Sequence, residues 1–181
     1  MQGREILIGV TGGIAAYKSA YLVSRLVQAG AGVTVIMTRS ATELIGPHTF
    51  AALTGRAVRA DVFDPAKRHA HIELAREAEL LCVAPATANM IGKMANGIAD
   101  DLLSTVYLSF CGPVLLAPAM NCEMWEKKSV QRNLAQLKDD GALFVGPETG
   151  RLSCGESGVG RMAEPDQIVR AIEAALPSVA Q

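Results

Sequence analysis

The sequence has few aromatic residues, no closely spaced cysteine pair and no long apolar run. Aromatic residues make up 4% of the 181 residues, whereas hydrophobic residues make up 50%. A core must then be built mainly from Ala, Val, Ile, Leu and Met, as is typical of parallel sheets covered by helices. The cysteines are widely separated and form no C-x-x-C pair, so we predict a reduced, cytoplasmic protein without a metal site.

Charge of one sign is not concentrated anywhere in the chain. The formal net charge is -1 and no long basic run is present, so the electrostatic signature of a nucleic-acid-binding protein is missing. The amino terminus lacks a basic stretch followed by a long apolar one, and runs such as LLCVAPA are too short to cross a bilayer. We therefore expect a small-molecule ligand, with no nucleic-acid and no membrane partner.

Short apolar runs recur along the chain, with helix-length segments between them. The runs occupy residues 5–10, 33–37, 80–84, 114–117 and 142–146. Helices are predicted over 14–29, across 130–137 and within 164–176. This βαβ series predicts one α/β domain over residues 1–181 with a central parallel sheet. The loops after its strands should meet at the carboxyl edge of the sheet, where such folds bind ligands.

The first two of these loops carry residue types that suit a phosphate group. Gly12 and Gly13 stand between a strand and a helix, where backbone N–H groups can approach an anion, although glycine there also serves backbone geometry alone. The motif is not G-x-G-x-x-G, and the second strand ends without an acidic residue for an adenine ribose, which disfavours NAD. Thr38, Arg39 and Ser40 supply hydroxyls and positive charge, so FMN fits better than a dinucleotide. Ser40 could instead be the N-cap of the following helix.

The third loop has room for a flat ring. Thr87, Ala88 and Asn89 have small side chains and amides that can pair with a polar ring edge, although helix capping is the simpler interpretation of the turn alone. Downstream, Asp100 and Asp101 precede an apolar segment and are predicted to be charges at a helix N-terminus.

Six motifs follow one another along the chain. They are GGIAAYK (12–18), HIEL (71–74), PATANM (85–90), NGIADDLLST (96–105), PAMNCEMW (118–125) and CGESGVGRM (154–162). Together they resemble the flavin-dependent cysteine decarboxylases, most closely the members that act on phosphopantothenoylcysteine in coenzyme A biosynthesis. The similarity extends from about residue 4 to residue 176. It implies a flavodoxin-like (Rossmann-like) three-layer fold, bound FMN, and homo-trimers or a dodecamer of trimers, with flavin and substrate near subunit interfaces.

The resemblance also implies roles for matching residues. FMN would be held by Gly12, Gly13, Ile14, Thr38, Ser40, Thr87, Ala88 and Asn89. The catalytic set would be His71 as base, Cys154 as proton donor and Asn121, which with Ala119 and Met120 would also bind substrate. Met90 departs from the pattern, since the family usually has Thr at this position.

The implied reaction explains why a flavin and an acid are needed. Direct loss of CO2 from a cysteine-derived carboxylate would leave an unstabilised carbanion. Hydride transfer to FMN from the carbon next to sulfur gives a thioaldehyde, from which CO2 leaves to give an enethiolate. Return of the hydride with a proton yields 4'-phosphopantetheine. A cysteine, with an ordinary pKa of about 8.5, can be that acid, and the Gly- and Ser-rich run around Cys154 is predicted to be a lid.

Each candidate also has a simpler interpretation. An isolated cysteine is usually a small buried hydrophobe, which we expect for Cys82 and Cys111. His71 should lie near a helix start, where neutral imidazole is favoured, and a metal pair with His69 lacks a third ligand nearby. Asn121 could have no role in substrate binding and serve only to stabilise an Asx turn.

Three other functions remain as alternatives. Oxidative peptidyl-cysteine decarboxylases of the same family lack the loop that carries Cys154 here. A flavin-binding regulatory subunit would not need His71, Asn121 and Cys154 together, and a nicotinamide oxidoreductase would need the missing fingerprint. Many bacterial members are fused to a phosphopantothenate–cysteine ligase, and the chain stops about where such a domain would start. A stand-alone domain, fusion to this ligase and partnership with it all remain open from the sequence.

Overall fold

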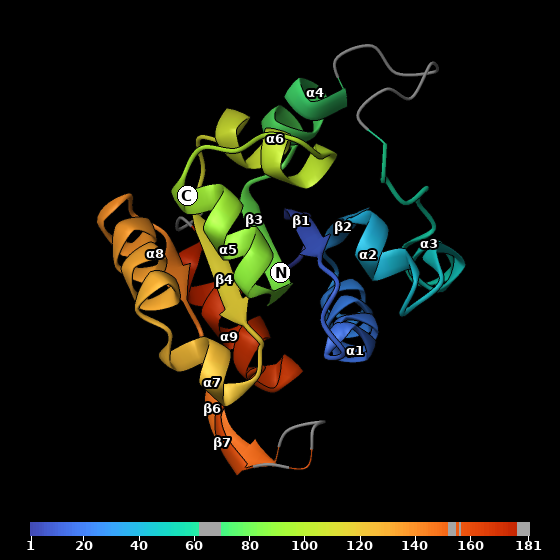
Figure 1. The fold of residues 1–181 in the computed structure, drawn as a ribbon. Helices are drawn as coiled ribbons and strands as arrows, with labels where there is room; N and C mark the ends of the chain where they lie inside the picture. The colour runs from blue at the N-terminus through green and yellow to red at the C-terminus, as the bar shows by residue number, and fades with distance from the viewer. Residues whose placement is uncertain (62–69, 152–154, 156, 177–181) are drawn as a thin grey trace.

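Five parallel strands form the central sheet, in the order β2-β1-β3-β4-β5 (Figure 1). The strands are β1 (Glu5–Val10), β2 (Gly32–Met37), β3 (Leu80–Ala86), β4 (Val114–Pro118) and β5 (Leu143–Phe144). The computed structural model describes residues 1–61, 70–151, 155 and 157–176. This strand order is that of flavodoxin-like folds, and it puts the topological switch point between β1 and β3. The predicted fold class is confirmed, although within the run at 142–146 the strand β5 comprises only Leu143 and Phe144.

Helices cover both faces of the sheet. One face carries α1 (Ala16–Gln28), α3 (Pro47–Thr54) and α9 (Pro165–Ala175), and the other carries α4 (Ala70–Glu77), α5 (Ala88–Ala95), α6 (Leu102–Ser109) and α8 (Lys128–Asp139). The short helices α2 (Arg39–Thr42) and α7 (Cys122–Glu126) follow β2 and β4. No helix in the described part of the chain has the length and apolar character that a membrane span requires.

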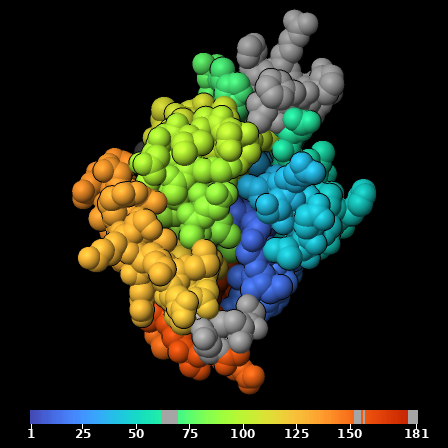
Figure 2. Space-filling view, viewed as in Figure 1, coloured from blue at the N-terminus to red at the C-terminus, as the bar shows by residue number. Residues whose placement is uncertain are grey.

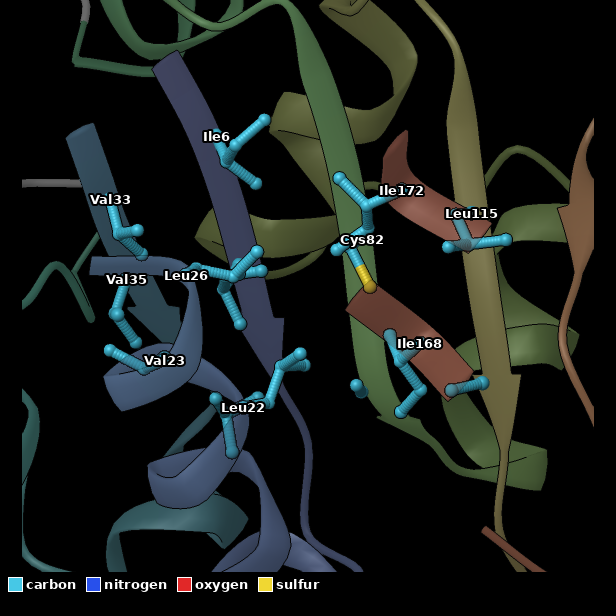
Figure 3. Close-up of a cluster of buried hydrophobic side chains, with 14 of the residues drawn as sticks. Ile6, Leu22, Val23, Leu26, Val33, Val35, Cys82, Leu115, Ile168 and Ile172 are labelled. Carbon is cyan, nitrogen blue, oxygen red and sulfur yellow. The ribbon is translucent and has the colours of Figure 1, made fainter. Parts of the chain in front are cut away.

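Alternate residues of each strand enter opposite core clusters. On β1, Ile6 and Ile8 face α1 and α9, whereas Leu7 packs on the other face. Figure 3 shows the first cluster, in which the sulfur of Cys82 lies among aliphatic side chains. Burial raises the pKa of the Cys82 thiol to about 12, as befits a structural hydrophobe. The same prediction is wrong for Cys111, which is exposed in the turn between α6 and β4.

The segment after β5 forms a hairpin where the sequence indicated only a loop. Strand β6 (Glu148–Arg151) pairs antiparallel with β7 (Ser157–Arg161). The Met120 N–H donates to the Gly160 carbonyl oxygen at 2.9 Å, so the base of the hairpin is attached to the loop after β4. Gly160 has a φ of 150°, and a Cβ there would overlap the Met120 carbonyl oxygen. Only glycine allows this approach.

Candidate functional site

A cleft of about 1620 Å³ opens at the carboxyl edge of the sheet. The loops after β1, β2, β3 and β4 and the β6–β7 hairpin all contribute to its lining, as predicted. In Figure 2, the first loop and α1 (blue) lie between the α2–α3 side (cyan) and the α5–α7 side (green to yellow). The lining includes Gly12, Gly13, Ile14, Thr38, Ser40, Thr87, Ala88, Asn89, Ala119, Met120 and Asn121. The structure therefore brings together every predicted flavin residue and the three predicted substrate residues.

The first loop offers unused backbone donors. The N–H groups of Gly12 and Ile14 make no hydrogen bond within the described part of the chain, and α1 begins at Ala16 without a side-chain cap. A Cβ on Gly12 would overlap the Cβ of Ser40, so glycine is needed for the first two loops to approach each other. Free N–H groups at the positive end of a helix dipole suit a phosphate group.

Thr38, and not Ser40, caps α2. The Thr38 Oγ1 accepts the Ala41 N–H at 3.3 Å, while the Thr38 N–H donates to the Val10 carbonyl at 3.0 Å. The alternative interpretation of Ser40 as an N-cap is therefore wrong. Ser40 is an exposed residue of α2 and lines the cleft, where its hydroxyl can form a hydrogen bond with a ligand.

The polar groups of Thr87 stabilise the third loop. Its Oγ1 accepts the Met90 N–H at 3.4 Å and so caps α5, and its own N–H donates to the Thr11 hydroxyl at 3.2 Å. The exposed Asn89 side chain and the Ala88 backbone are therefore available to contact a bound ring. The Met90 side chain is buried in the second core cluster, so packing replaces the hydroxyl group usual at this position.

Asn121 is held by an N-cap at the start of α7. Its Oδ1 accepts the Glu123 N–H at 2.8 Å, which confirms the Asx-type interaction, and the residue also lines the cleft. A capping role and a place in the cleft are therefore compatible. The next residue, Cys122, is half-buried against Gly158 of β7, so helix α7 and the hairpin are in close contact.

His71 lies apart from the cleft of its own chain. It is half-buried in the first turn of α4 and is not among the residues that line the cleft. Helix α4 packs against α6, and Figure 1 shows both at the end of the molecule opposite the β6–β7 hairpin. Within one chain the structure does not bring His71 and Asn121 together. Cys154 and His69 lie outside the described residues.

A charged cluster that the sequence analysis missed lines the cleft beside α5. Lys93 Nζ pairs with Asp101 Oδ2 at 2.8 Å and with Asp100 Oδ1 at 2.6 Å. Asp101 also caps α6, since its Oδ1 accepts the Ser104 N–H at 2.8 Å, which confirms the predicted helix-terminal role. Burial alone would raise the pKa of Asp101, but hydrogen bonds from Lys93 and Ser104 outweigh it and lower the pKa below its ordinary 3.8. Lys93 lies one helical turn after the predicted flavin residue Asn89, and this spacing could have predicted that Lys93 also lines the cleft.

Replacing Asp101 with asparagine should lower the free energy of unfolding by about 1 kcal/mol at neutral pH. Asparagine keeps the cap but loses the charge-assisted bond to Lys93. Because the folded-state pKa is depressed, the carboxylate stabilises the fold above the unfolded pKa and loses its contribution as the pH falls through the folded pKa. In urea unfolding, the difference from wild type should therefore shrink below pH 3.8. A difference that stays constant with pH would contradict this assignment. Asp101→Ala, which also lacks the cap, should be less stable than Asp101→Asn at neutral pH.

Comparison with known proteins identifies the family. The model of the Flavoprotein family matches residues 1–176. This chain belongs to the Flavoprotein family. It is 49% identical over 175 residues to the coenzyme A biosynthesis bifunctional protein CoaBC of Bacillus subtilis, covering 96% of this chain and 43% of that protein. The Escherichia coli (strain K12) CoaBC is 44% identical over 171 residues, covering 93% of this chain and 42% of that protein. The chain thus spans less than half the length of these bifunctional relatives.

Solved structures place this Flavoprotein chain among decarboxylases of the same fold. A mutant PPC decarboxylase in complex with pantothenoylaminoethenethiol superimposes with a TM-score of 0.85 at 28% identity, covering 96% of this chain and 98% of that one. The FMN-dependent cysteine decarboxylase SpaF gives a TM-score of 0.83 at 35% identity, covering 96% and 95% of the two chains. The resemblance to flavin-dependent cysteine decarboxylases is therefore confirmed.

Proposed function

We propose that this chain decarboxylates 4'-phosphopantothenoylcysteine to 4'-phosphopantetheine with FMN as its cofactor. The observation that carries the proposal is the cleft at the β1/β3 switch point of a Flavoprotein chain, lined by all eight predicted flavin residues described above. The CoaBC relatives are named for coenzyme A biosynthesis, and their identity of 42% to 49% supports this substrate. The first of the solved structures above is named as a PPC decarboxylase, which agrees with it.

The residues of the cleft fit FMN. The Gly12 and Ile14 N–H groups and the Ser40 hydroxyl would hold the phosphate, and Ala88 and Asn89 would face the ring. When bound, FMN supplies a reversible acceptor for a hydride from the carbon next to the substrate sulfur. Thr38 and Thr87 support these contacts by capping the helices that follow.

Asn121 would orient the substrate carboxylate. A carboxylate only accepts hydrogen bonds, so the Asn121 Nδ2 group is the atom that would donate to it. The N-cap bond to the Glu123 N–H fixes this side chain before substrate arrives. Ala119 and Met120 line the same part of the cleft, and Arg39 and Arg151 add positive charge for a phosphorylated ligand. The bond between the carboxylate and its neighbouring carbon would then break beside the flavin ring, which releases CO2.

We propose that His71 acts in the cleft of a second copy of the chain. His71 lies outside the cleft of its own chain, so a role as base requires a neighbouring subunit to present it. A trimer with heterologous interfaces would give each cleft one such histidine. Cys154 is the proposed proton donor and follows the cleft-lining Arg151 by three positions in the sequence. The complete site would thus combine two subunits.

Incubation of the purified protein with FMN and 4'-phosphopantothenoylcysteine tests the proposed function. We expect a yellow protein that converts the substrate to a product lighter by one CO2 and fully saturated, as measured by mass spectrometry. A peptide ending in cysteine serves as the comparison substrate. Conversion of that peptide alone would favour the peptidyl-cysteine decarboxylases, and FMN binding without release of CO2 would favour a regulatory flavoprotein. Failure to take up FMN would overturn the proposal.

A further inference from the structure

Thr11 joins the first and third loops of the cleft. It is 2% exposed, follows β1 directly and lines the cleft next to Gly12. Its Oγ1 donates to the Pro85 carbonyl at 2.6 Å and accepts the Thr87 N–H at 3.2 Å. The Thr87 hydroxyl lies 3.2 Å from the same oxygen. One buried hydroxyl thus connects two loops that are far apart in the sequence.

The hydroxyl satisfies a backbone group that the sheet leaves out. The ladder between β1 and β3 ends at the pair Gly9 and Val83, two residues before Pro85. A buried carbonyl without a partner is costly, and the Thr11 hydroxyl supplies the partner for Pro85. Because the same oxygen accepts from Thr87, the N-cap residue of α5 is fixed relative to β1.

The two joined loops flank the topological switch point. A Cβ on Gly13 would lie 3.3 Å from Thr87 Cγ2 and 3.4 Å from Pro85 Cγ, so the loops are already in close contact. Gly12 and Ile14 would hold the flavin phosphate, and Ala88 and Asn89 would face its ring. The separation between these two sets of donors therefore depends on the contact that Thr11 makes. A small shift in that separation would weaken both ends of the binding site together.

We propose that Thr11 is a positioning residue for the flavin, which fixes the ring-binding turn at Thr87 against the phosphate-binding loop. The inference rests on the proposed function, since it takes FMN as the ligand of the cleft. Neither the sequence pattern nor the family motifs assigned a role to Thr11. Its contribution is made through Thr87 and Pro85, and so it should appear in the affinity for FMN before any substrate is added.

Ser19 provides a matched control. Its Oγ donates to the Ala84 carbonyl at 2.6 Å, one residue before the carbonyl that Thr11 serves, and Ser19 is 0% exposed. Both hydroxyls therefore make a buried bond of the same length to adjacent residues of β3. Ser19 lies on α1 outside the cleft lining, and within the described part of the chain its hydroxyl makes no hydrogen bond to Thr87. A purely structural effect should be shared by both positions, whereas a flavin effect should be confined to Thr11.

The test compares FMN binding by apoprotein of wild type, Thr11→Val, Thr11→Ser and Ser19→Ala. Valine has the shape of threonine without the hydroxyl, and we expect it to raise the dissociation constant for FMN at least about tenfold, because two hydrogen bonds are lost. Thr11→Ser and Ser19→Ala should bind FMN within about twofold of wild type. Quenching of FMN fluorescence measures the constant, and thermal unfolding of the same apoproteins shows whether Thr11→Val and Ser19→Ala are equally destabilised.

Two results would overturn the role of Thr11. One is unchanged FMN affinity in Thr11→Val, and the other is an equal loss of affinity in Ser19→Ala. If Thr11→Val does not fold, Thr11→Ala replaces it, and unchanged affinity there counts against the proposal in the same way. Absence of FMN binding by wild type would instead refute the proposed function, so the two failures are distinguishable.

Discussion

Replacing His71 with asparagine should slow CO2 release by at least about a hundredfold while leaving the affinity for FMN unchanged. Asparagine retains hydrogen-bonding capacity but cannot take up a proton at neutral pH. The separation of effects is expected because His71 is proposed to reach a neighbouring cleft as a base for the substrate, while FMN would be held there by that chain's own loops. Product formation by mass spectrometry and FMN binding by fluorescence quenching measure the two quantities.

Mixed oligomers can show whether His71 acts between subunits. Asn121→Ala should also be inactive, because it removes the side chain that would orient the carboxylate. When the two inactive variants are coexpressed, about one quarter of the clefts should receive an intact Asn121 and an intact His71 from a neighbour. Recovered activity near that fraction would support a shared site. If mixtures stay inactive although mixed oligomers form, a base provided by the second subunit is excluded.

Replacing Cys154 with serine should separate loss of CO2 from completion of the reaction. A serine hydroxyl is a much weaker acid than a thiol, so the variant should release CO2 once and form the saturated product at least about a hundredfold more slowly. The expected product is the enethiol, lighter than 4'-phosphopantetheine by two hydrogen atoms, and the flavin absorption should remain bleached. Mass spectrometry and the visible spectrum record both outcomes.

Cys122 is the matched control for this variant. It is half-buried beside the β6–β7 hairpin and does not line the cleft, so Cys122→Ser should complete the reaction. Normal formation of the saturated product by Cys154→Ser would show that another group is the acid. An enethiol produced by Cys122→Ser as well would mean that general disturbance of the hairpin, rather than loss of the thiol, stops the reaction.

The periodic parts of the fold were predictable from the sequence. Fully buried strands such as β1 and β3 are continuous apolar runs, and α1 ends where Gly30 adopts a positive φ. The hairpin was missed because its strands carry Gly, Ser and Arg in place of alternating apolar residues. The prediction for Cys111 failed because an apolar neighbourhood in sequence does not decide on which side of a turn a residue lies.

The sequence predicted which residues line the cleft where a loop follows a strand, but it did not predict which of these loops contact one another. All the predicted flavin residues line one cleft because parallel strands end at a common edge. The bond between Thr11 and Thr87 depends on strand order, which places β1 beside β3, and periodicity does not reveal that order. The separation of His71 from the cleft that contains Asn121 could not be predicted for the same reason. The order of motifs along the chain does not reveal where each helix packs on the sheet.

The contact of Gly160 with Met120 also bears on how this cleft could be changed by selection. Any other amino acid at position 160 would collide with the backbone of the loop that carries Asn121, whatever its polarity or size. Libraries meant to adapt the enzyme to foreign thiols should therefore leave this codon unaltered and diversify exposed neighbours such as Met124. Position 160 of the hairpin thus accepts only glycine, whereas the neighbouring rim of the cleft on α7 is open to variation.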